Sequence, residues 1–449
     1  MTPGRAAGQR RPRPRLVLGA AVLVLAAAAC VVSPDVTVFV LPADKVKAPP
    51  PPGGFGAEDR YQRGHYLEVQ RYLESLPPAT LDASAVNMAL YGKVLLARGD
   101  YEAAWRALER ARALEPRAVR RAEVEWALSQ GAILWNDFAS AEEYASAAVR
   151  DGYGLVPGFL HFLAALRDVD VYSGVAVGQS GEAEFDMHGF NLIRVPVRVN
   201  GVDSAAIIDS GAVYTIVTRS FASEVHVRVI PDSRASGRGL HKKEFPVDFG
   251  VIGELDFAGF SLKEVPVMVM PDEAMLFDTT RGPFPVPIVL GLHLLKEFTN
   301  EIDYGARRMR WTRADFRVPK RSPDQNLFFR GGRLFARGSI DRNGFYQFLL
   351  DTGSEPTLMT TAGTARAGLP PSNKVFPKKV YGLGKTQVEW GRIQEVTIGL
   401  AGYGARFQNL AVKEDDSAFE DGIVGTSLLQ YFRVRIDFAR MVLSLDEGS

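Results

Sequence analysis

Two short aspartate turns, each following an apolar run, are the residues of this chain best suited to chemistry. Two acids held close together cannot both ionise readily, so they share a proton and can act as base and acid together. One Asp-(Ser/Thr)-Gly sequence alone is also an ordinary strand-ending turn. Two such turns predict a two-carboxylate active site with Asp209 and Asp351 as its catalytic acids. The turns, 142 residues apart, are Asp209-Ser210-Gly211-Ala212 and Asp351-Thr352-Gly353-Ser354.

The turns belong to an internal repeat, which strengthens this interpretation. Apolar segments ending in glycine follow both turns, at Val289-Leu290-Gly291 and at Ile423-Val424-Gly425. Beyond them the two halves match at a constant offset of 134, with Leu294-Leu295, Phe298 and Ile302-Asp303-Tyr304 answering to Leu428-Leu429, Phe432 and Ile436-Asp437-Phe438. We therefore expect two homologous lobes at 189–316 and 327–446, joined by a linker at 317–326.

These turns and glycine segments resemble those of the aspartic proteases, and of the retropepsin-like group in particular. The resemblance implies one small, mainly β lobe for each half, with the two turns meeting between the lobes. Because both lobes lie in one chain, it implies no need for a homodimer. Asp209 and Asp351 would activate a water that attacks a peptide carbonyl.

The resemblance also implies roles for the neighbouring residues. The hydroxyls of Ser210 and Thr352 would link the turns, and Gly211 and Gly353 would let the backbone turn tightly beside the acids. Ser354 could donate a hydrogen bond to Asp351, whereas Ala212 cannot donate one to Asp209, so we expect Asp351 to be the ionised partner. Hairpin flaps over the substrate are expected at 237–242 and 381–385, and their candidate substrate-binding residues are Gly239, Leu240, Gly382 and Leu383.

Residues 57–166 differ in character, being rich in Ala, Leu, Glu and Arg at helical spacing. Gly92, Leu95, Ala104 and Leu108 belong to a pattern that resembles the tetratricopeptide repeat, in which paired helices stack. About two and a half such repeats are few for an independent solenoid, so we expect them to pack against the lobes. They could bind a protein partner or serve only as a helical spacer. Residues 167–188 would connect them to the first lobe.

The amino terminus predicts export from the cytoplasm. Basic residues precede an apolar run at 16–29, which is the order of a signal segment. The single cysteine, Cys30, ends an Ala-Ala-Ala-Cys sequence that resembles a bacterial lipoprotein box. Lipidation of Cys30, an uncleaved membrane anchor and release after cleavage all remain open. We assign 1–32 to this segment and 33–56 to a Pro/Gly-rich linker.

Composition excludes several other functions. The 53 lysines and arginines nearly balance the 52 acidic residues, so no basic face for nucleic acid is expected. The six histidines are isolated in the sequence, and the single cysteine has no second cysteine beside it to form a metal-binding pair. Neither a metal nor another cofactor is therefore predicted.

The sequence thus predicts a multidomain α + β protein, with tetratricopeptide-like helical hairpins followed by a mainly β, two-lobed acid-protease fold. Its expected function is that of a membrane-anchored, extracytoplasmic aspartic endopeptidase acting on peptides or proteins. One alternative is a catalytically inactive scaffold that binds partners through its helical repeats. Another is a hydrolase that uses its two carboxylates on glycosidic bonds.

Overall fold

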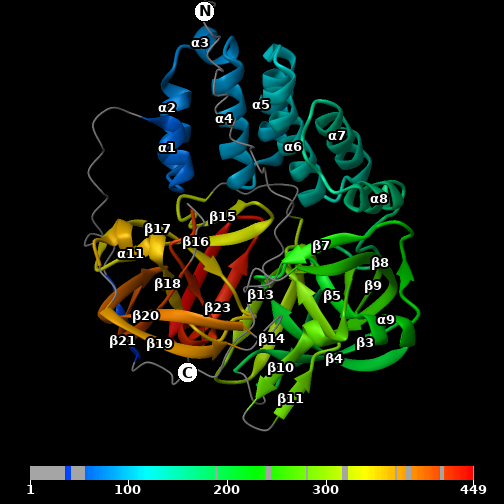
Figure 1. Ribbon diagram of the computed structural model, residues 1–449, viewed down its shortest axis with the longest axis vertical. Coiled ribbons are helices and arrows are strands. Elements are labelled where there is room, and N and C mark those ends of the chain that lie inside the picture. The colour runs from blue at the N-terminus through cyan, green and yellow to red at the C-terminus, as the bar shows by residue number, and fades with distance from the viewer. Residues whose placement is uncertain are drawn as a thin grey trace, which may run out of the picture.

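The computed structural model describes residues 36–41, 56–187, 191–238, 244–279, 282–315, 322–369, 372–380, 386–414 and 419–447. Helices lie above two β lobes that stand side by side (Figure 1). The predicted signal or anchor segment at 1–32, including Cys30, falls outside the described residues. Within the described ranges, no helix has the length and apolar character required to span a membrane.

The helical domain runs from Ala57 to Leu166 as a series of short antiparallel hairpins. Side chains of Ser84, Asp100 and Asp137 accept hydrogen bonds from backbone N–H groups in the first turns of three helices, which fixes where those helices begin. The helices are α1 (Ala57–Gln62), α2 (Tyr66–Ser75), α3 (Pro78–Asp82), α4 (Ala85–Ala97), α5 (Tyr101–Leu114), α6 (Ala118–Leu134), α7 (Phe138–Arg150) and α8 (Pro157–Leu166).

Small residues allow neighbouring helices of this domain to approach closely. A Cβ atom added to Gly92 would lie 2.5 Å from Cγ of Leu108, and one added to Gly131 would lie 2.8 Å from Cδ2 of Leu96. Such close approach is what stacked helix pairs require. The hairpins confirm the predicted helical region, and their identity as tetratricopeptide repeats stays a prediction.

The first lobe is a strongly curved sheet with the strand order β3-β4-β12-β5-β9-β8-β6, and β7 is paired to β8. Strand β3 also pairs with β8, which closes the sheet on itself. The elements are β3 (Arg194–Val199), β4 (Val202–Asp209), β5 (Thr215–Thr218), α9 (Arg219–Glu224), β6 (Arg228–Val229), β7 (Ala235–Arg238), β8 (Glu244–Phe257), β9 (Phe260–Met270), a 3₁₀ turn (Asp272–Met275), the hairpin β10 (Leu276–Thr279) and β11 (Gly282–Pro285), β12 (Ile288–Gly291) and α10 (Leu292–Leu295).

The second lobe repeats this arrangement with the order β21-β18-β22-β17-β16-β20-β19, with β15 paired to β16. In both lobes the strand that leads to the aspartate runs parallel to the strand of the apolar-apolar-glycine segment. The elements are β15 (Leu327–Arg330), β16 (Arg333–Ile340), β17 (Asn343–Leu350), β18 (Leu358–Thr360), α11 (Thr361–Ala367), β19 (Ser372–Val380), β20 (Thr386–Leu400), β21 (Tyr403–Lys413), β22 (Gly422–Val424) and α12 (Thr426–Leu429).

A shared sheet joins the lobes beneath the two turns. Its order is β2-β14-β13-β23-β24, in which β13 of the first lobe pairs antiparallel with β23 of the second. Arg433 and Arg435 of β23 form ion pairs with Asp303 and Glu301 of β13. One chain therefore brings both lobes together. The strands are β2 (Ser180–Glu184), β13 (Phe298–Asp303), β14 (Arg308–Arg313), β23 (Phe432–Asp437) and β24 (Val442–Glu447).

Two segments that the sequence assigned to connections contain paired strands. Strand β1 (Val36–Val40), within the predicted linker 33–56, pairs antiparallel with β21 at the edge of the second lobe. Strand β2, within the predicted connection 167–188, pairs with β14 in the shared sheet. Both are short strands at a sheet edge, and their partners lie far away in the sequence, so local composition gave no sign of the pairing.

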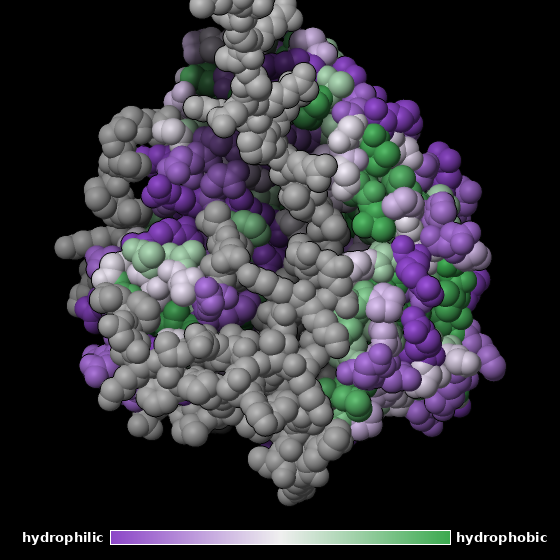
Figure 2. Space-filling model, in the orientation of Figure 1, coloured by the Kyte–Doolittle hydropathy of each residue, from purple (hydrophilic) through white to green (hydrophobic). Residues whose placement is uncertain are grey.

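The helical domain packs on both lobes, as predicted. The ring of Phe162 from α8 stacks on Phe249 of β8, with centroids 4.3 Å apart. On the second lobe, the hydroxyl of Tyr66 donates to Oε1 of Gln347 at 3.0 Å. On the face shown in Figure 2, hydrophilic side chains cover much of the described surface, with smaller apolar patches between them.

Candidate active site

The two aspartates lie at matching ends of buried strands. The last four residues of strand β4, which ends at Asp209, are all buried. Strand β17 ends at Leu350, immediately before Asp351. Both side chains are almost wholly inaccessible, with 3% exposed for Asp209 and 0% for Asp351. The fold thus delivers one carboxylate from each lobe to their common interface, where the sequence placed the catalytic pair.

Reciprocal hydrogen bonds link the two turns through the predicted hydroxyl residues. The backbone N–H of Ser210 donates to Oγ1 of Thr352 at 3.0 Å, and the N–H of Thr352 donates to Oγ of Ser210 at 3.1 Å. Each hydroxyl then donates across the interface, Ser210 to the carbonyl of Leu350 at 2.7 Å and Thr352 to that of Ile208 at 3.0 Å. Because all these groups are buried, the link fixes one turn relative to the other.

Replacing Thr352 with Val should weaken the association of the lobes. The variant keeps the side-chain shape but leaves the Ser210 N–H and the Ile208 carbonyl without their buried partners, at a cost of about 1–3 kcal/mol. Denaturant unfolding of the full chain measures this loss. Thr37→Val, at an exposed position of β1, is the matched control. Equal stability of the two variants would contradict a structural role for the link.

Each turn glycine lies against the carboxylate of the opposite turn. A Cβ atom on Gly353 would lie 2.1 Å from Cγ of Asp209, and one on Gly211 would lie 2.5 Å from Cγ of Asp351. No side chain larger than hydrogen fits at either position without displacement. The glycines therefore permit the two acids to approach each other.

The two carboxyls differ in their backbone donors. Oδ1 of Asp209 accepts hydrogen bonds from the N–H groups of Gly211 at 2.8 Å and Ala212 at 3.0 Å. Oδ1 of Asp351 accepts one from Gly353 at 2.9 Å, whereas the N–H of Ser354 donates to the backbone carbonyl of Asp351. The additional donor favours the charged form of Asp209.

The pKa shifts of the two acids also favour Asp209 as the ionised partner. Burial raises the pKa of Asp209 to about 6, against the lowering effect of its hydrogen bonds to Asp351, Gly211 and Ala212. Burial, the charge of Asp209 and a hydrogen bond to that residue raise the pKa of Asp351 well above its ordinary value. Asp351 is therefore the acid that keeps its proton more readily, and Asp209 is the one that ionises first.

This assignment reverses the one expected from Ser354. Its hydroxyl donates to the carbonyl of Pro356 at 3.2 Å, two residues along the chain, and not to Asp351. Ser354 has a hydroxyl that Ala212 lacks, but the backbone N–H of Ala212 supplies the additional hydrogen bond that favours ionised Asp209. A residue type says which hydrogen bonds are available and not where the side chain points.

Replacing Ser354 with Ala should leave the acidic limb of a pH–rate profile where it is in the wild type. The removed hydroxyl contacts a backbone carbonyl and neither acid, so the pKa of Asp209 has no reason to change. Peptide cleavage from pH 4 to pH 8 would measure the limb. Movement of the limb to higher pH would instead support a hydrogen bond from Ser354 to the dyad.

The residues that follow each apolar-apolar-glycine segment donate hydrogen bonds to the chain at the end of the aspartate turn and just after it. The N–H groups of Leu292 and His293 donate to the carbonyls of Ala212 at 2.7 Å and Val213 at 2.9 Å. In the second lobe, Thr426 donates to the carbonyl of Ser354 and Ser427 to that of Glu355, both at 2.8 Å. The repeat detected in the sequence is thus a repeated hydrogen-bonding frame around each acid.

Sequence reasoning missed three supporting residues. Thr215 and Thr357 accept hydrogen bonds from the N–H groups of Gly291 at 3.4 Å and Gly425 at 3.1 Å. Each threonine stands six positions after its aspartate, and this shared spacing could have revealed them. Asn191, which donates to Oε1 of Glu355 in the other lobe at 2.7 Å, has no such signal.

The predicted flap residues cannot be placed beside the dyad. Gly239, Leu240, Gly382 and Leu383 all lie outside the described residues. Strands β7 and β8, and likewise β19 and β20, pair as antiparallel hairpins on either side of those positions. Among described residues, no group of three or more His, Cys, Asp or Glu side chains is arranged to hold a metal ion.

Comparison with known proteins finds one family model that matches part of each lobe. Residues 195–294 and 337–428 match the family model described as "Aspartyl protease". Among solved structures, an aspartic proteinase from Irpex lacteus is similar with a TM-score of 0.37 and 11% identity, over 60% of this chain and 98% of that chain. A retropepsin-like aspartic protease from Rickettsia conorii has a TM-score of 0.20 and 14% identity, over 30% and 92%. No curated protein sequence matches significantly.

The family match and the observed topology select the same elements. Each matched segment contains one aspartate turn, the strand that leads to it and the glycine segment behind it. The matched segments also have the same strand order. The chain therefore combines an N-terminal helical domain with a two-lobed aspartic-protease fold.

Proposed function

We propose that this protein is an aspartic endopeptidase whose catalytic pair is Asp209 and Asp351. The observation that carries the proposal is that two buried carboxyls, one from each lobe, lie at equivalent turns, each against the glycine of the other turn. Asp209 would take a proton from a water molecule, which attacks the peptide carbonyl, while Asp351 donates its proton to the carbonyl oxygen. Asp209 would then pass its proton to the leaving amine as the C–N bond breaks, and Asp351 would recover its proton from one hydroxyl of the intermediate as the carbonyl re-forms.

Hydrolysis of a glycosidic bond is less compatible with this site. Glycosidases generally hold their two carboxyl groups roughly 5 Å or more apart, to admit a sugar carbon or a water between them. Here Asp209 and Asp351 are close enough to hydrogen-bond each other. A shared proton suits activation of water between two acids, and the family match favours peptide hydrolysis.

An inactive scaffold is the remaining alternative. Against it stand both acids, both linking hydroxyls and both glycines, all present in the arrangement that the chemistry needs. Loss of catalysis would remove any reason to keep two buried acids together, because burying them costs stability when they ionise. Binding of a protein partner by the helical domain would be compatible with either function.

Incubation of the full-length protein with a diverse peptide library and with an unfolded protein tests the proposal. Mass spectrometry should detect internal cleavage, and a statine-type peptide, whose hydroxyl mimics the tetrahedral intermediate, should inhibit it. Absence of cleavage across acidic and neutral pH by a demonstrably folded sample would favour the scaffold alternative. Release of sugars from oligosaccharides would favour the glycosidase.

We further propose that the active site lies outside the cytoplasm and that this protein is attached to a membrane through its amino terminus. Support comes from the basic residues before the apolar run at 16–29 and from the position of Cys30. If Cys30 is lipidated, Cys30→Ala should abolish incorporation of labelled fatty acid. A membrane-bound Cys30→Ala variant would indicate an uncleaved anchor, and wild-type protein without lipid in the soluble fraction would indicate release.

A further inference from the structure

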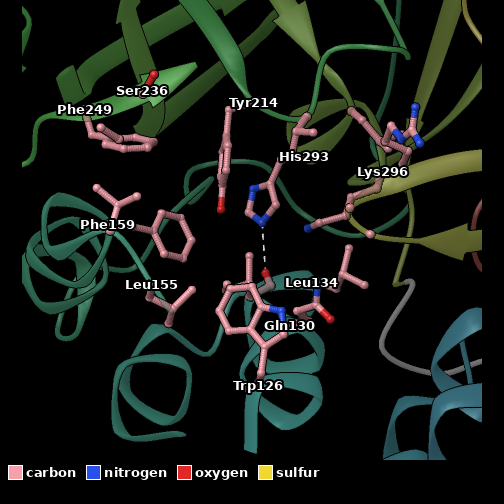
Figure 3. A pocket seen from close by; sticks show the side chains of 18 of the residues that line it. Trp126, Gln130, Leu134, Leu155, Phe159, Tyr214, Ser236, Phe249, His293 and Lys296 are labelled. Atoms are coloured by element: carbon pink, nitrogen blue, oxygen red, sulfur yellow. Dashed lines mark hydrogen bonds between the residues drawn. The ribbon is translucent and has the colours of Figure 1, made fainter. Parts of the chain in front are cut away.

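A pocket of about 340 Å³ lies where the helical domain meets both lobes. Trp126 and Leu155 form its helical side, and Tyr214 and His293 of the first lobe face them across the open space (Figure 3). Gly332 and Phe419 close the pocket from the second lobe. A pocket built from three parts of the fold exists only when those parts are assembled.

Buried hydrogen bonds hold the helical wall against the first lobe. Nε2 of His293 lies 2.9 Å from the carbonyl oxygen of Ile133 at the end of α6 (Figure 3), and Nδ1 lies 2.9 Å from the hydroxyl of Tyr172. Three residues further on, Nζ of the fully buried Lys296 donates to Oδ1 of Asn136 at 2.9 Å. The pocket is therefore preformed, as small-molecule and side-chain sites usually are.

The pocket lies beside the segment that follows the catalytic turn of the first lobe. Val213, which lines it, is four residues after Asp209 and accepts a hydrogen bond from His293 through its carbonyl. Across the lobe interface, a Cβ atom on Gly332 would lie 3.4 Å from Cγ1 of Val213. Four residues of chain span at most about 14 Å. An extended peptide advances about 3.3 Å per residue, so about four residues of a substrate would cover that distance.

The lining chemistry selects an uncharged, apolar side chain. The ring of Trp126 stacks on Tyr153 with centroids 5.4 Å apart, and Phe159 and Phe249 add further aromatic surface. The cationic groups are already paired, since Lys296 contacts Glu297, and Arg333 contacts Glu420 at 2.7 Å. An acidic side chain would gain little there, whereas a large apolar one would bury its surface.

We propose that this pocket is a substrate subsite, built in part by the helical domain, that binds one large apolar or aromatic side chain of the peptide. The inference rests on the proposed peptidase function and adds its substrate class. The helical domain then contributes directly to specificity, in place of acting only as a spacer or a partner platform.

The two lobes differ at the residues that hold this pocket together, although they are otherwise repeats of each other. At the constant offset of 134, Ser427 takes the place of His293 and Gln430 that of Lys296. Oγ of Ser427 accepts a hydrogen bond from the N–H of Thr357 at 2.8 Å, within its own lobe. The second lobe thus lacks the two side chains that fasten α6 to the first lobe. A preference for a large apolar residue is expected on one side of the scissile bond only.

A positional peptide library tests the subsite, with Phe, Trp, Leu or Ala placed at successive positions around the cleaved bond. For the wild type, kcat/KM should be at least about tenfold higher with an aromatic residue than with Ala at one position. Leu155→Trp, which fills the pocket, should bring that ratio close to one. Val149→Trp, at a 36% exposed position of α7, should behave as the wild type.

Two outcomes would overturn the subsite: equal cleavage of aromatic and Ala peptides by the wild type, or an unchanged ratio in folded Leu155→Trp. If Leu155→Trp fails to fold, Trp126→Ala removes one aromatic wall and should also lower the ratio. If the wild type cleaves nothing, the peptidase function fails, and calorimetry with the same peptides judges the pocket separately. Tighter binding of aromatic than Ala peptides, lost on filling the pocket, would support it, and equal binding would refute it.

Discussion

Replacing either Asp209 or Asp351 with Asn should lower kcat/KM for a peptide substrate by about 10²- to 10⁴-fold, the usual contribution of a positioned acid or base. Asp209→Asn removes the group that takes the proton from water. Asp351→Asn removes the acid that protonates the carbonyl oxygen. Because the two groups share one proton, the losses should not add, and the double variant should be about as inactive as either single variant.

Both variants should remain folded, which allows the loss to be read as chemistry. The side-chain carbonyl of Asn can still accept the N–H bonds of Gly211 and Ala212 at position 209. At position 351, Asn removes a buried group whose ionised form is unfavourable. Asp203→Asn, on the same strand β4 with an 88% exposed side chain, is the matched control and should keep full activity. Activity in either dyad variant equal to that of this control would contradict the assignment.

Replacing Gly353 with Ala is expected to have the second largest effect. The added methyl group would lie 2.1 Å from Cγ of Asp209, a distance that real Cβ contacts do not show, so the carboxyl or its turn must move. Overpacking of this kind costs about 1–3 kcal/mol of stability. Displacement of the acid should lower kcat/KM by about 10²-fold or more, since catalysis tolerates misplacement of about 1 Å poorly.

Comparison with two other glycines separates the clash from a general effect of alanine. Gly211→Ala, 2.5 Å from Cγ of Asp351, should also lose activity, because the turns are equivalent. At Gly154 a Cβ atom would meet nothing within 4 Å, so Gly154→Ala should leave stability and cleavage close to those of the wild type. Thermal unfolding together with peptide cleavage measures both effects. Normal cleavage by Gly353→Ala would contradict the close packing of glycine and acid.

The sequence was informative wherever a feature occurs twice. The Asp turns, the glycine segments and the apolar pattern after them recur in both halves, and the structure places each pair in equivalent positions. The helices were also predictable, since Ala-rich periodicity and N-capping residues such as Asp100 and Asp137 are local signals. The fold class follows from these repeated and local patterns.

Features that depend on tertiary contacts could not be predicted. The pairing of β1 with β21 joins residues far apart in sequence, and nothing around Val36 indicates its partner. The orientation of the Ser354 hydroxyl depends on the path of the chain through Pro356. His293 was classed among isolated histidines, yet the packing of α6 against α10 makes it a buried bridge between domains.

The pH dependence of kcat/KM from pH 3 to pH 9 tests the shared proton most directly, because it reports the pKa values of the free enzyme's acid and base. Activity requires ionised Asp209, so it should fall as the pH drops through about 6, the pKa raised by burial. It also requires protonated Asp351, so it should fall again at higher pH, where that group loses its proton. The account predicts a bell-shaped profile. A profile that stays flat through pH 6, with both acids present and the protein folded, would contradict the dyad.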